Sequence, residues 1–251
     1  MRSILITGGA GYIGLHTSLV FLEKGYQLFI LDSFANSSYK SIERLLRISS
    51  TNKNFSTKQI SFFEGDIRDL FFLRRLFDEA LRLEKPIEAV VHFAGLKSVS
   101  ESISNPDLYW DVNVNGTNKL LKVMQEFNCH NLVFSSSATV YSSKEKSPLT
   151  ENSNLLPSDP YGETKLEVEN ILKEYLNVKN NFKFFSLRYF NPIGAHPSGE
   201  IGEFPLKKPD NLFPYICDVA NSKRSTLYVF GNDWPTKDGT CIRDYIHIMD
   251  L

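Results

Sequence analysis

The stretch that decides the fold is TGGAGYIG, residues 7–14, in which Gly8, Gly11 and Gly14 follow a short apolar run and open an amphipathic stretch. This spacing is typical of a dinucleotide-binding turn between a first β-strand and a first helix. Glycine suits the turn because a side chain would hold the backbone away from a pyrophosphate, and the helix N-terminus offers free N–H groups to the phosphates. A glycine-rich turn without a ligand is the alternative.

Short apolar runs alternate with longer amphipathic stretches over residues 1–189. The apolar runs predict strands at Ser3–Thr7, Gln27–Asp32, Ile60–Glu64, 89–93, 132–136 and 184–188. The stretches between them predict helices near 12–24, 40–48, 69–84, 107–127 and 161–176. This alternation predicts an α/β domain with a doubly wound parallel Rossmann-type sheet, buried on both faces.

The amino-acid composition of the chain changes after about residue 190, where proline and glycine become frequent. Such density breaks regular elements, so residues 190–251 are expected to begin a smaller substrate domain. Within it, the sequence predicts a short helix near 212–221 and a strand near 226–230.

Composition excludes several classes of protein. The net charge is −1, which favours neither a nucleic acid nor an anionic membrane as partner. No apolar run approaches the roughly 20 residues of a membrane helix, and the run after Met1 is too short for a signal peptide, so we expect a cytoplasmic protein. Three scattered cysteines suggest no disulfide framework, and five scattered histidines suggest no metal site.

Acidic and small residues follow the later predicted strands. Asp32 comes eighteen residues after Gly14, where this fold places the acid that binds the adenosine ribose. A carboxylate there repels a 2′-phosphate, so NAD is favoured over NADP; a simple turn residue is the alternative. Asp66 and Ile67 are placed to meet the adenine, although Asp66 could instead cap the next helix. Residues 93–95, Phe-Ala-Gly, supply small groups beside the centre of the cofactor.

A catalytic group is predicted from Tyr161, Lys165 and the serines at 135–137. The tyrosine and lysine are four residues apart on one helical face, where an ammonium would lower the phenol pKa from ~10 and make Tyr161 a general base. A solvated Tyr/Lys pair is the alternative. The serines end the fifth predicted strand, at the edge where open α/β sheets bind ligands.

The sequence resembles the extended short-chain dehydrogenase/reductases, and within them the UDP-glucose 4-epimerases. The resemblance is carried by motifs along nearly the whole chain: TGGAGYIG, HFAGLKSVSES, NVNGT, FSSSATVY, YGETK, LRYFNPIGAHPSG, NLFPYI, FGNDWPTKDGT and RDYIHIMDL.

The resemblance implies roles for individual residues. The implied catalytic residues are Ser137, which would bond the sugar 4-hydroxyl, Tyr161 as base, Lys165 and, in a proton relay, Asn113. The implied NAD-binding residues are Gly8, Gly11, Tyr12, Ile13, Gly14, Asp32, Asn36, Ser37, Asp66, Ile67, Phe93, Ala94, Gly95, Lys97, Tyr161, Lys165 and Phe190. The implied substrate-binding residues are Lys97, Ser137, Tyr161, Asn191, Asn211, Leu212, Phe230 and Arg243. Asn191 could be only a turn residue, and Arg243 only a surface ion pair.

The implied function is interconversion of UDP-glucose and UDP-galactose by C4 oxidation and re-reduction with tightly bound NAD, in a homodimer formed by the helices near 107–127 and 161–176. A 4,6-dehydratase is disfavoured because Ala138 and Thr139 stand where such enzymes carry an Asp-Glu pair. Two alternatives stay open. One is an epimerase that also accepts UDP-N-acetylhexosamines. The other is an inactive NAD-binding remnant, since about a quarter of the family's length is missing.

Three positions depart from the family pattern. Val112 replaces a common asparagine, Ser142 replaces a glycine after Val-Tyr, and Asp210 replaces an asparagine beside Asn211. These changes could weaken cofactor or substrate binding.

Overall fold

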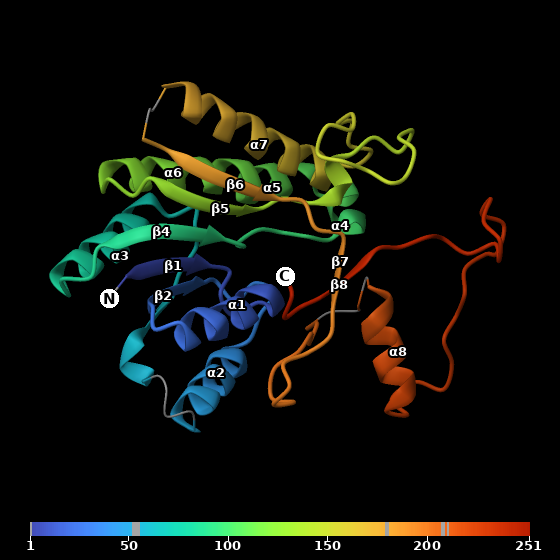
Figure 1. Cartoon of the computed structure of the whole chain (residues 1–251), viewed down its shortest axis with the longest axis horizontal. Coiled ribbons are helices and arrows are strands. Elements are labelled where there is room, and N and C mark those ends of the chain that lie inside the picture. Colours follow the sequence, from blue (N-terminus) through green and yellow to red (C-terminus); the bar gives the residue numbers. More distant parts are fainter. Residues whose placement is uncertain (1, 52–55, 179–180, 207–208, 210) are drawn as a thin grey trace.

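The computed structural model of the chain describes residues 2–51, 56–178, 181–206, 209 and 211–251. Its centre is a parallel sheet of six strands in the order β3-β2-β1-β4-β5-β6 (Figure 1). The strands are β1 Ser3–Thr7, β2 Gln27–Asp32, β3 Ile60–Glu64, β4 Ile87–His92, β5 Asn131–Ser135 and β6 Lys183–Leu187. This is the order of the dinucleotide-binding fold, and it confirms the predicted class.

The strand order reverses between β1 and β4, which lie side by side with Thr7 paired to His92. The chain leaves β1 and β4 toward opposite faces of the sheet, so a crevice forms beyond their carboxyl ends. The glycine-rich turn after β1 and the turn after β4 both border this crevice.

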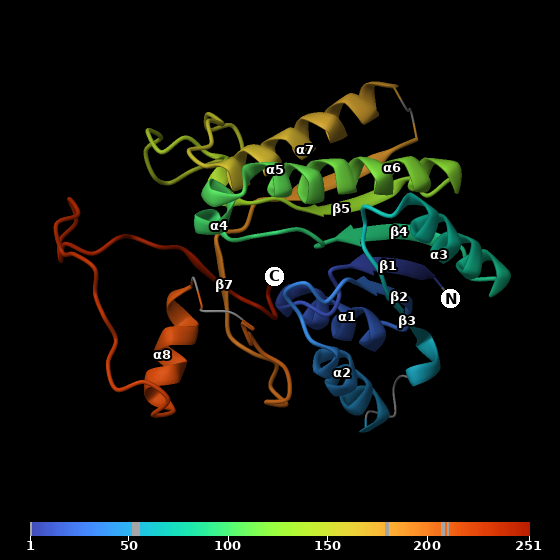
Figure 2. The same cartoon turned by 180° about the vertical axis from the view of Figure 1, so that it is seen from behind.

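Helices cover both faces of the sheet (Figures 1 and 2). On one face lie α1 Tyr12–Glu23 and α2 Tyr39–Thr51, and on the other lie α3 Leu70–Arg82, α6 Gly116–Glu126 and α7 Pro160–Val178. Each strand sends alternate side chains to the two faces, so Leu5 joins the core under α3, α6 and α7 while Ile4 and Ile6 join the core under α1 and α2. This explains why the strands are apolar at nearly every position.

The helix predicted at 107–127 is three consecutive segments. These are α5 Pro106–Tyr109, a π-helix at Trp110–Asn115 and α6, preceded by a short helix that was not predicted, α4 Val99–Ser104. Apolar periodicity cannot distinguish a π-helical turn from the α-helix around it. The strands predicted at Ser3–Thr7, Gln27–Asp32 and Ile60–Glu64 have the observed bounds, and the other predicted boundaries differ by at most three residues, as helix and strand ends commonly do.

Beyond β6 the chain forms a small second sheet from β7 Asn191–Ile193 and β8 Tyr245–His247, with α8 Leu212–Ala220 between them. The remaining short elements are 3₁₀ turns at Thr57–Gln59 and Ala138–Val140. The strand predicted at 226–230 is wrong, because this segment has no strand beside it in the described part of the chain and Phe230 is 98% exposed. Figure 2 shows α8 and the segment after it reaching away from the main sheet.

Over the residues that the structure describes, no helix is long and apolar enough to span a membrane.

Candidate active site

The glycine-rich turn is packed so closely that side chains are excluded. Gly8 has a φ of +69°, and a Cβ added to it would lie 2.7 Å from the amide nitrogen of Ala94. A Cβ on Gly14 would lie 2.3 Å from the carbonyl oxygen of Gly8. Gly11 starts α1 without a side-chain cap, so no side chain occupies the end of the helix where Tyr12 and Ile13 present their N–H groups. The turn therefore leaves room and donors for a pyrophosphate, which a merely structural glycine turn does not require.

Asp32 ties this turn to the loop after β2. Its Oδ2 accepts from the N–H of Ala10 at 2.9 Å, and its Oδ1 accepts from the N–H of Phe34 at 2.9 Å and the hydroxyl of Ser37 at 2.7 Å. A carboxylate has about four acceptor positions, so one is left for a ribose hydroxyl. Asn36 lies in the same loop.

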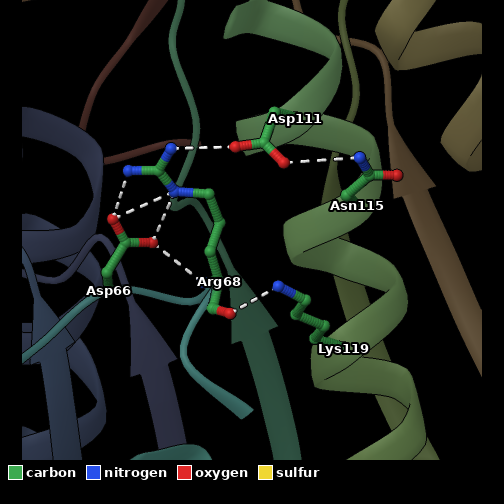
Figure 3. A network of polar contacts seen from close by, with 5 residues as sticks. All are labelled: Asp66, Arg68, Asp111, Asn115 and Lys119. Atoms are coloured by element: carbon green, nitrogen blue, oxygen red, sulfur yellow. Dashed lines mark hydrogen bonds and ion pairs between the residues drawn. The ribbon is translucent and has the colours of Figure 1, made fainter.

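Asp66 belongs to an ion-pair network that the sequence did not reveal (Figure 3). The Arg68 guanidinium donates to both carboxyl oxygens of Asp66, at 2.7 to 3.1 Å, and to Asp111 in the π-helix at 2.9 Å. These bonds from Arg68 hold the pKa of Asp66 below its usual value. The alternative that Asp66 caps α3 is wrong, since Asp69 is that cap. The side chain of Ile67 is buried in the core, and its contact with an adenine stays a prediction.

The turn after β4 is fixed by Asn113. The side-chain oxygen of Asn113 accepts from the N–H of Leu96 at 2.8 Å, and its nitrogen donates to the Leu96 carbonyl at 3.1 Å and to Thr164 at 3.0 Å. A Cβ on Gly95 would lie 2.9 Å from the side-chain oxygen of Asn113 and 3.8 Å from Nζ of Lys165. The amide of Asn113 thus joins the cofactor turn to helix α7, and its part in a proton relay stays a prediction.

A buried histidine at the end of β4 joins the end of β1 to helix α6. Nδ1 of His92 lies 2.6 Å from the hydroxyl of Thr7, and Nε2 lies 2.9 Å from the hydroxyl of Thr117. Because Thr117 donates its proton to the carbonyl of Asn113, it accepts from Nε2–H, and Nδ1 accepts from Thr7. Burial, with a smaller effect of the Lys165 charge, lowers the pKa of His92 to about 3 and keeps the ring neutral.

Ser137, Tyr161 and Lys165 are brought together at the carboxyl end of β5. The ammonium of Lys165 is buried, donates to the carbonyl of Ser135 at 2.9 Å and lies 5.7 Å from the centre of the Tyr161 ring. Burial lowers the pKa of Lys165 to about 8. A fully solvated Tyr/Lys pair is excluded, because Lys165 is buried and Tyr161 is half-buried.

The predicted lowering of the Tyr161 pKa is not what the chain itself produces. Burial raises this pKa to about 12, and a hydrogen bond with Ser137 opposes the rise. The prediction took the nearby ammonium into account but not the free-energy cost of burying a phenolate, which raises the pKa. The hydroxyl of Ser137 also accepts from the backbone and side chain of Thr139, at 3.2 and 3.0 Å.

On the substrate side, two predicted residues meet at a carboxylate that was not predicted. Nζ of Lys97 lies 3.7 Å from Glu203, and the amide of Asn211 donates to the same Glu203 oxygen at 3.1 Å. Tyr12 reaches the same region through a 2.7 Å hydrogen bond from its hydroxyl to the carbonyl of Gly194. No sequence motif distinguishes Glu203 from other surface carboxylates.

The other predicted substrate residues have different surroundings. Asn191 donates to the carbonyl of Asp244 at 2.8 Å and so holds β7 beside β8, in agreement with a structural role. Leu212, Phe230 and Arg243 are exposed, and Arg243 makes no ion pair within the described residues. Phe190 lines a cavity of about 440 Å³ together with Tyr141 and Arg188.

The three departures from the family pattern have different settings. Val112 is half-buried in the π-helix. Ser142 is buried, and its hydroxyl accepts from the N–H of Lys144 at 3.2 Å, so it serves a turn. Asp210 lies outside the described residues.

Comparison with known proteins identifies the family. A family model described as GDP-mannose 4,6 dehydratase matches residues 5–251. UDP-glucose 4-epimerase 2 of Arabidopsis thaliana is 49% identical over 250 residues, which are 100% of this chain and 69% of the relative. UDP-glucose 4-epimerase of Bacillus subtilis is 47% identical over 249 residues, 99% of this chain and 70% of the relative.

The solved structures agree with the sequence relatives. UDP-glucose 4-epimerase from Bifidobacterium longum in complex with NAD+ and UDP superposes with a TM-score of 0.89 at 40% identity, covering 99% of this chain and 71% of that one. Residues 138–140 form a 3₁₀ turn with no carboxylate, so the acid–base pair of a dehydratase is missing from this position. The chain belongs to the UDP-glucose 4-epimerase family.

Proposed function

We propose that this chain is an NAD-dependent isomerase that interconverts UDP-glucose and UDP-galactose. The observation that carries the proposal is the meeting of Ser137, Tyr161 and Lys165 at the carboxyl edge of the sheet, beside Gly95 in the turn after β4. Two relatives named UDP-glucose 4-epimerase are 49% and 47% identical to this chain, and another was solved in complex with NAD+ and UDP.

NAD suits the crevice because glycines 8 and 14 leave no room for side chains and Asp32 keeps a free acceptor position. When bound, NAD supplies an acceptor for the C4 hydride and a positively charged ring. Tyr161 would take the proton of the 4-hydroxyl, Ser137 would hydrogen-bond to that hydroxyl, and Lys165 would hold the nicotinamide ribose and stabilise the phenolate. The same hydride would return to the other face of C4 and Tyr161 would return the proton, so no net oxidant or reductant would be consumed.

We assign the nucleotide sugar to the region that starts near residue 190. Lys97 and Arg243 supply positive charge for the diphosphate, and Asn191, Asn211 and Phe230 supply amide and apolar contacts. Of these residues, Lys97 and Asn211 already converge on Glu203. The domain boundary at 189/190 is supported by the end of β6 at Leu187 and the start of a separate sheet at β7.

The test is turnover of UDP-galactose to UDP-glucose by the purified chain, without net consumption of NADH. Tyr161→Phe is expected to lower kcat by roughly 10²- to 10⁴-fold, because it removes the acid–base group, and to leave NAD affinity unchanged. Tyr175→Phe on the same helix is the matched control, since Tyr175 packs against Phe182 instead. Undiminished turnover by Tyr161→Phe contradicts its role as base, and NAD binding without turnover by the wild type supports the remnant alternative.

We also propose a homodimer, formed through α5, the π-helix and α7. Helices α5 and α7 contact each other, and these segments carry the exposed apolar residues Leu108, Trp110 and Leu176. A cytoplasmic location belongs to the same proposal. Cell fractionation tests the location.

A further inference from the structure

Three consecutive serines meet helix α7 at three positions, each four residues from the next. The hydroxyl of the third serine of 135–137 interacts with Tyr161, and the carbonyl of the first accepts from Lys165 at 2.9 Å. The hydroxyl of the second donates to Glu169 at 2.6 Å. Positions four apart lie on one face of a helix, so α7 presents a single stripe to the end of β5.

The third position of the stripe is a buried ion pair. Glu169 is 1% exposed, and the guanidinium of Arg188 donates to its two oxygens at 2.8 and 2.6 Å. Burial raises the pKa of Glu169, but the hydrogen bonds from Arg188 and Ser136 outweigh it and leave the pKa below its usual value. The carboxylate therefore stays ionised, and Ser136 is the donor in the bond between them.

Arg188 is held in turn from outside the stripe. One of its terminal nitrogens donates to the hydroxyl of Tyr141 at 3.2 Å and to the carbonyl of Glu151 at 3.3 Å, and the guanidinium lies over the Tyr141 ring. A bidentate ion pair has a defined geometry, so the Glu169 carboxylate is held in place and can in turn hold Ser136 by a hydrogen bond.

Ser136 stands between two groups of the candidate active site. Its hydroxyl is buried and turned away from Tyr161, while the carbonyl before it binds Lys165 and the residue after it is Ser137. Fixing one residue fixes its two neighbours, because consecutive Cα atoms are only about 3.8 Å apart.

From this arrangement we infer that Ser136 is a positioning residue, anchored by the Glu169–Arg188 pair, which sets Ser137 against Tyr161 and the Ser135 carbonyl against Lys165. The inference rests on the proposed epimerase function for its catalytic consequence. Its structural part, that Ser136 holds the Ser135 carbonyl against the ammonium of Lys165, does not depend on that function.

The test compares Ser136→Ala with Ser186→Ala. Ser186 lies on the neighbouring strand, opposite Phe134, and its hydroxyl is buried without a hydrogen-bond partner among the described residues. Ser136→Ala is expected to lower kcat by roughly 10- to 100-fold, because a displacement of about 1 Å in an active site has effects of this size, while KM stays within about twofold. Ser186→Ala keeps the kcat of the wild type, and Ser136→Thr restores a hydroxyl and recovers most of the loss.

A second measurement does not depend on turnover. The pKa of Lys165 is followed by NMR of chain labelled at lysine Cε, with Lys165→Met to assign the signal. The carbonyl of Ser135 stabilises the ammonium, so Ser136→Ala is expected to lower this pKa by about half a unit or more, and Ser186→Ala is expected to leave it unchanged. The pKa of His92, which the Lys165 charge helps to lower, is about 3, so His92 stays neutral while Lys165 titrates.

The two ideas fail in different ways. If the wild type does not convert UDP-galactose, the proposed function is wrong. The role of Ser136 is then tested by the pKa of Lys165 alone. If the wild type turns over and Ser136→Ala equals Ser186→Ala in both kcat and the Lys165 titration, the positioning role is overturned while the function stands.

Discussion

Lys165 is a charge in a place where folding alone would favour an apolar side chain. Burial lowers its pKa from 10.5 to about 8, so between these values the unfolded chain binds more protons than the folded one. The stability of the fold with respect to this group therefore rises as pH increases from 8 to 10.5, and the cost of burial is fully present below pH 8.

Lys165→Met is accordingly expected to raise the free energy of unfolding at pH 7 by about 2 kcal/mol while abolishing turnover. At ~1.4 kcal/mol for each pKa unit, relief of burial gives roughly 3 kcal/mol, and the lost bond to the Ser135 carbonyl removes about 1. Urea unfolding at pH 7 and pH 10 checks this, since the gain should shrink at the higher pH. The exposed Lys173→Met on the same helix should show no gain; a less stable Lys165→Met contradicts the argument.

Single residues were predictable from the sequence where a short motif carries them. Tyr161, Lys165 and the glycine-rich turn belong to this class, and the structure brings each to the expected edge of the sheet. Glu169, Arg68 and Glu203 were not predicted, because each acts through a partner that only the folded chain brings near. The direction of the Tyr161 pKa was wrong for the same reason, since burial is a property of the whole fold.

The π-helix Trp110–Asn115 is the element that joins the two ends of the cofactor crevice. From it, Asp111 reaches Arg68 at the predicted adenine end, and Asn113 reaches the turn beside Lys165. The wider turn of a π-helix often marks a functional site, and here it sends side chains to both places within three residues.

Arg68→Gln is expected to weaken NAD binding about tenfold, which corresponds to ~1.4 kcal/mol. The change leaves Asp66 and Asp111 without the cation that both contact, so their loops lose a common anchor. Isothermal titration with NAD measures the effect, with UDP as a ligand that should be unaffected. Arg75→Gln, an exposed change on α3, is the control; equal NAD affinities for both variants argue against this network.

At the level of elements, the sequence was most informative where burial is complete. The six strands of the main sheet were all predicted, since each is an apolar run between turn signals. The strand expected at 226–230 failed because strand propensity without a neighbouring strand does not make a sheet. The three-residue strands β7 and β8 are too short to carry a pattern.

The whole molecule presents apolar side chains where a second copy is proposed to pack. Leu108→Glu is expected to convert a dimer to a monomer in size-exclusion chromatography with light scattering, because a charge would be buried between the two copies. Phe71→Glu on α3 is the control, since Phe71 is equally apolar and more exposed but lies on another element. A dimer that persists in Leu108→Glu, or a monomeric wild type, rejects this interface.

Among the residues that the structure describes, β6 is an edge strand of the main sheet and pairs with β5 alone, and Phe185 is exposed on it. The outer rim of this strand is a row of amide and carbonyl groups of the kind on which foreign chains nucleate. Concentrated preparations are therefore expected to aggregate through pairing of these edge strands. A lysine introduced in place of Phe185 is the simplest guard against it.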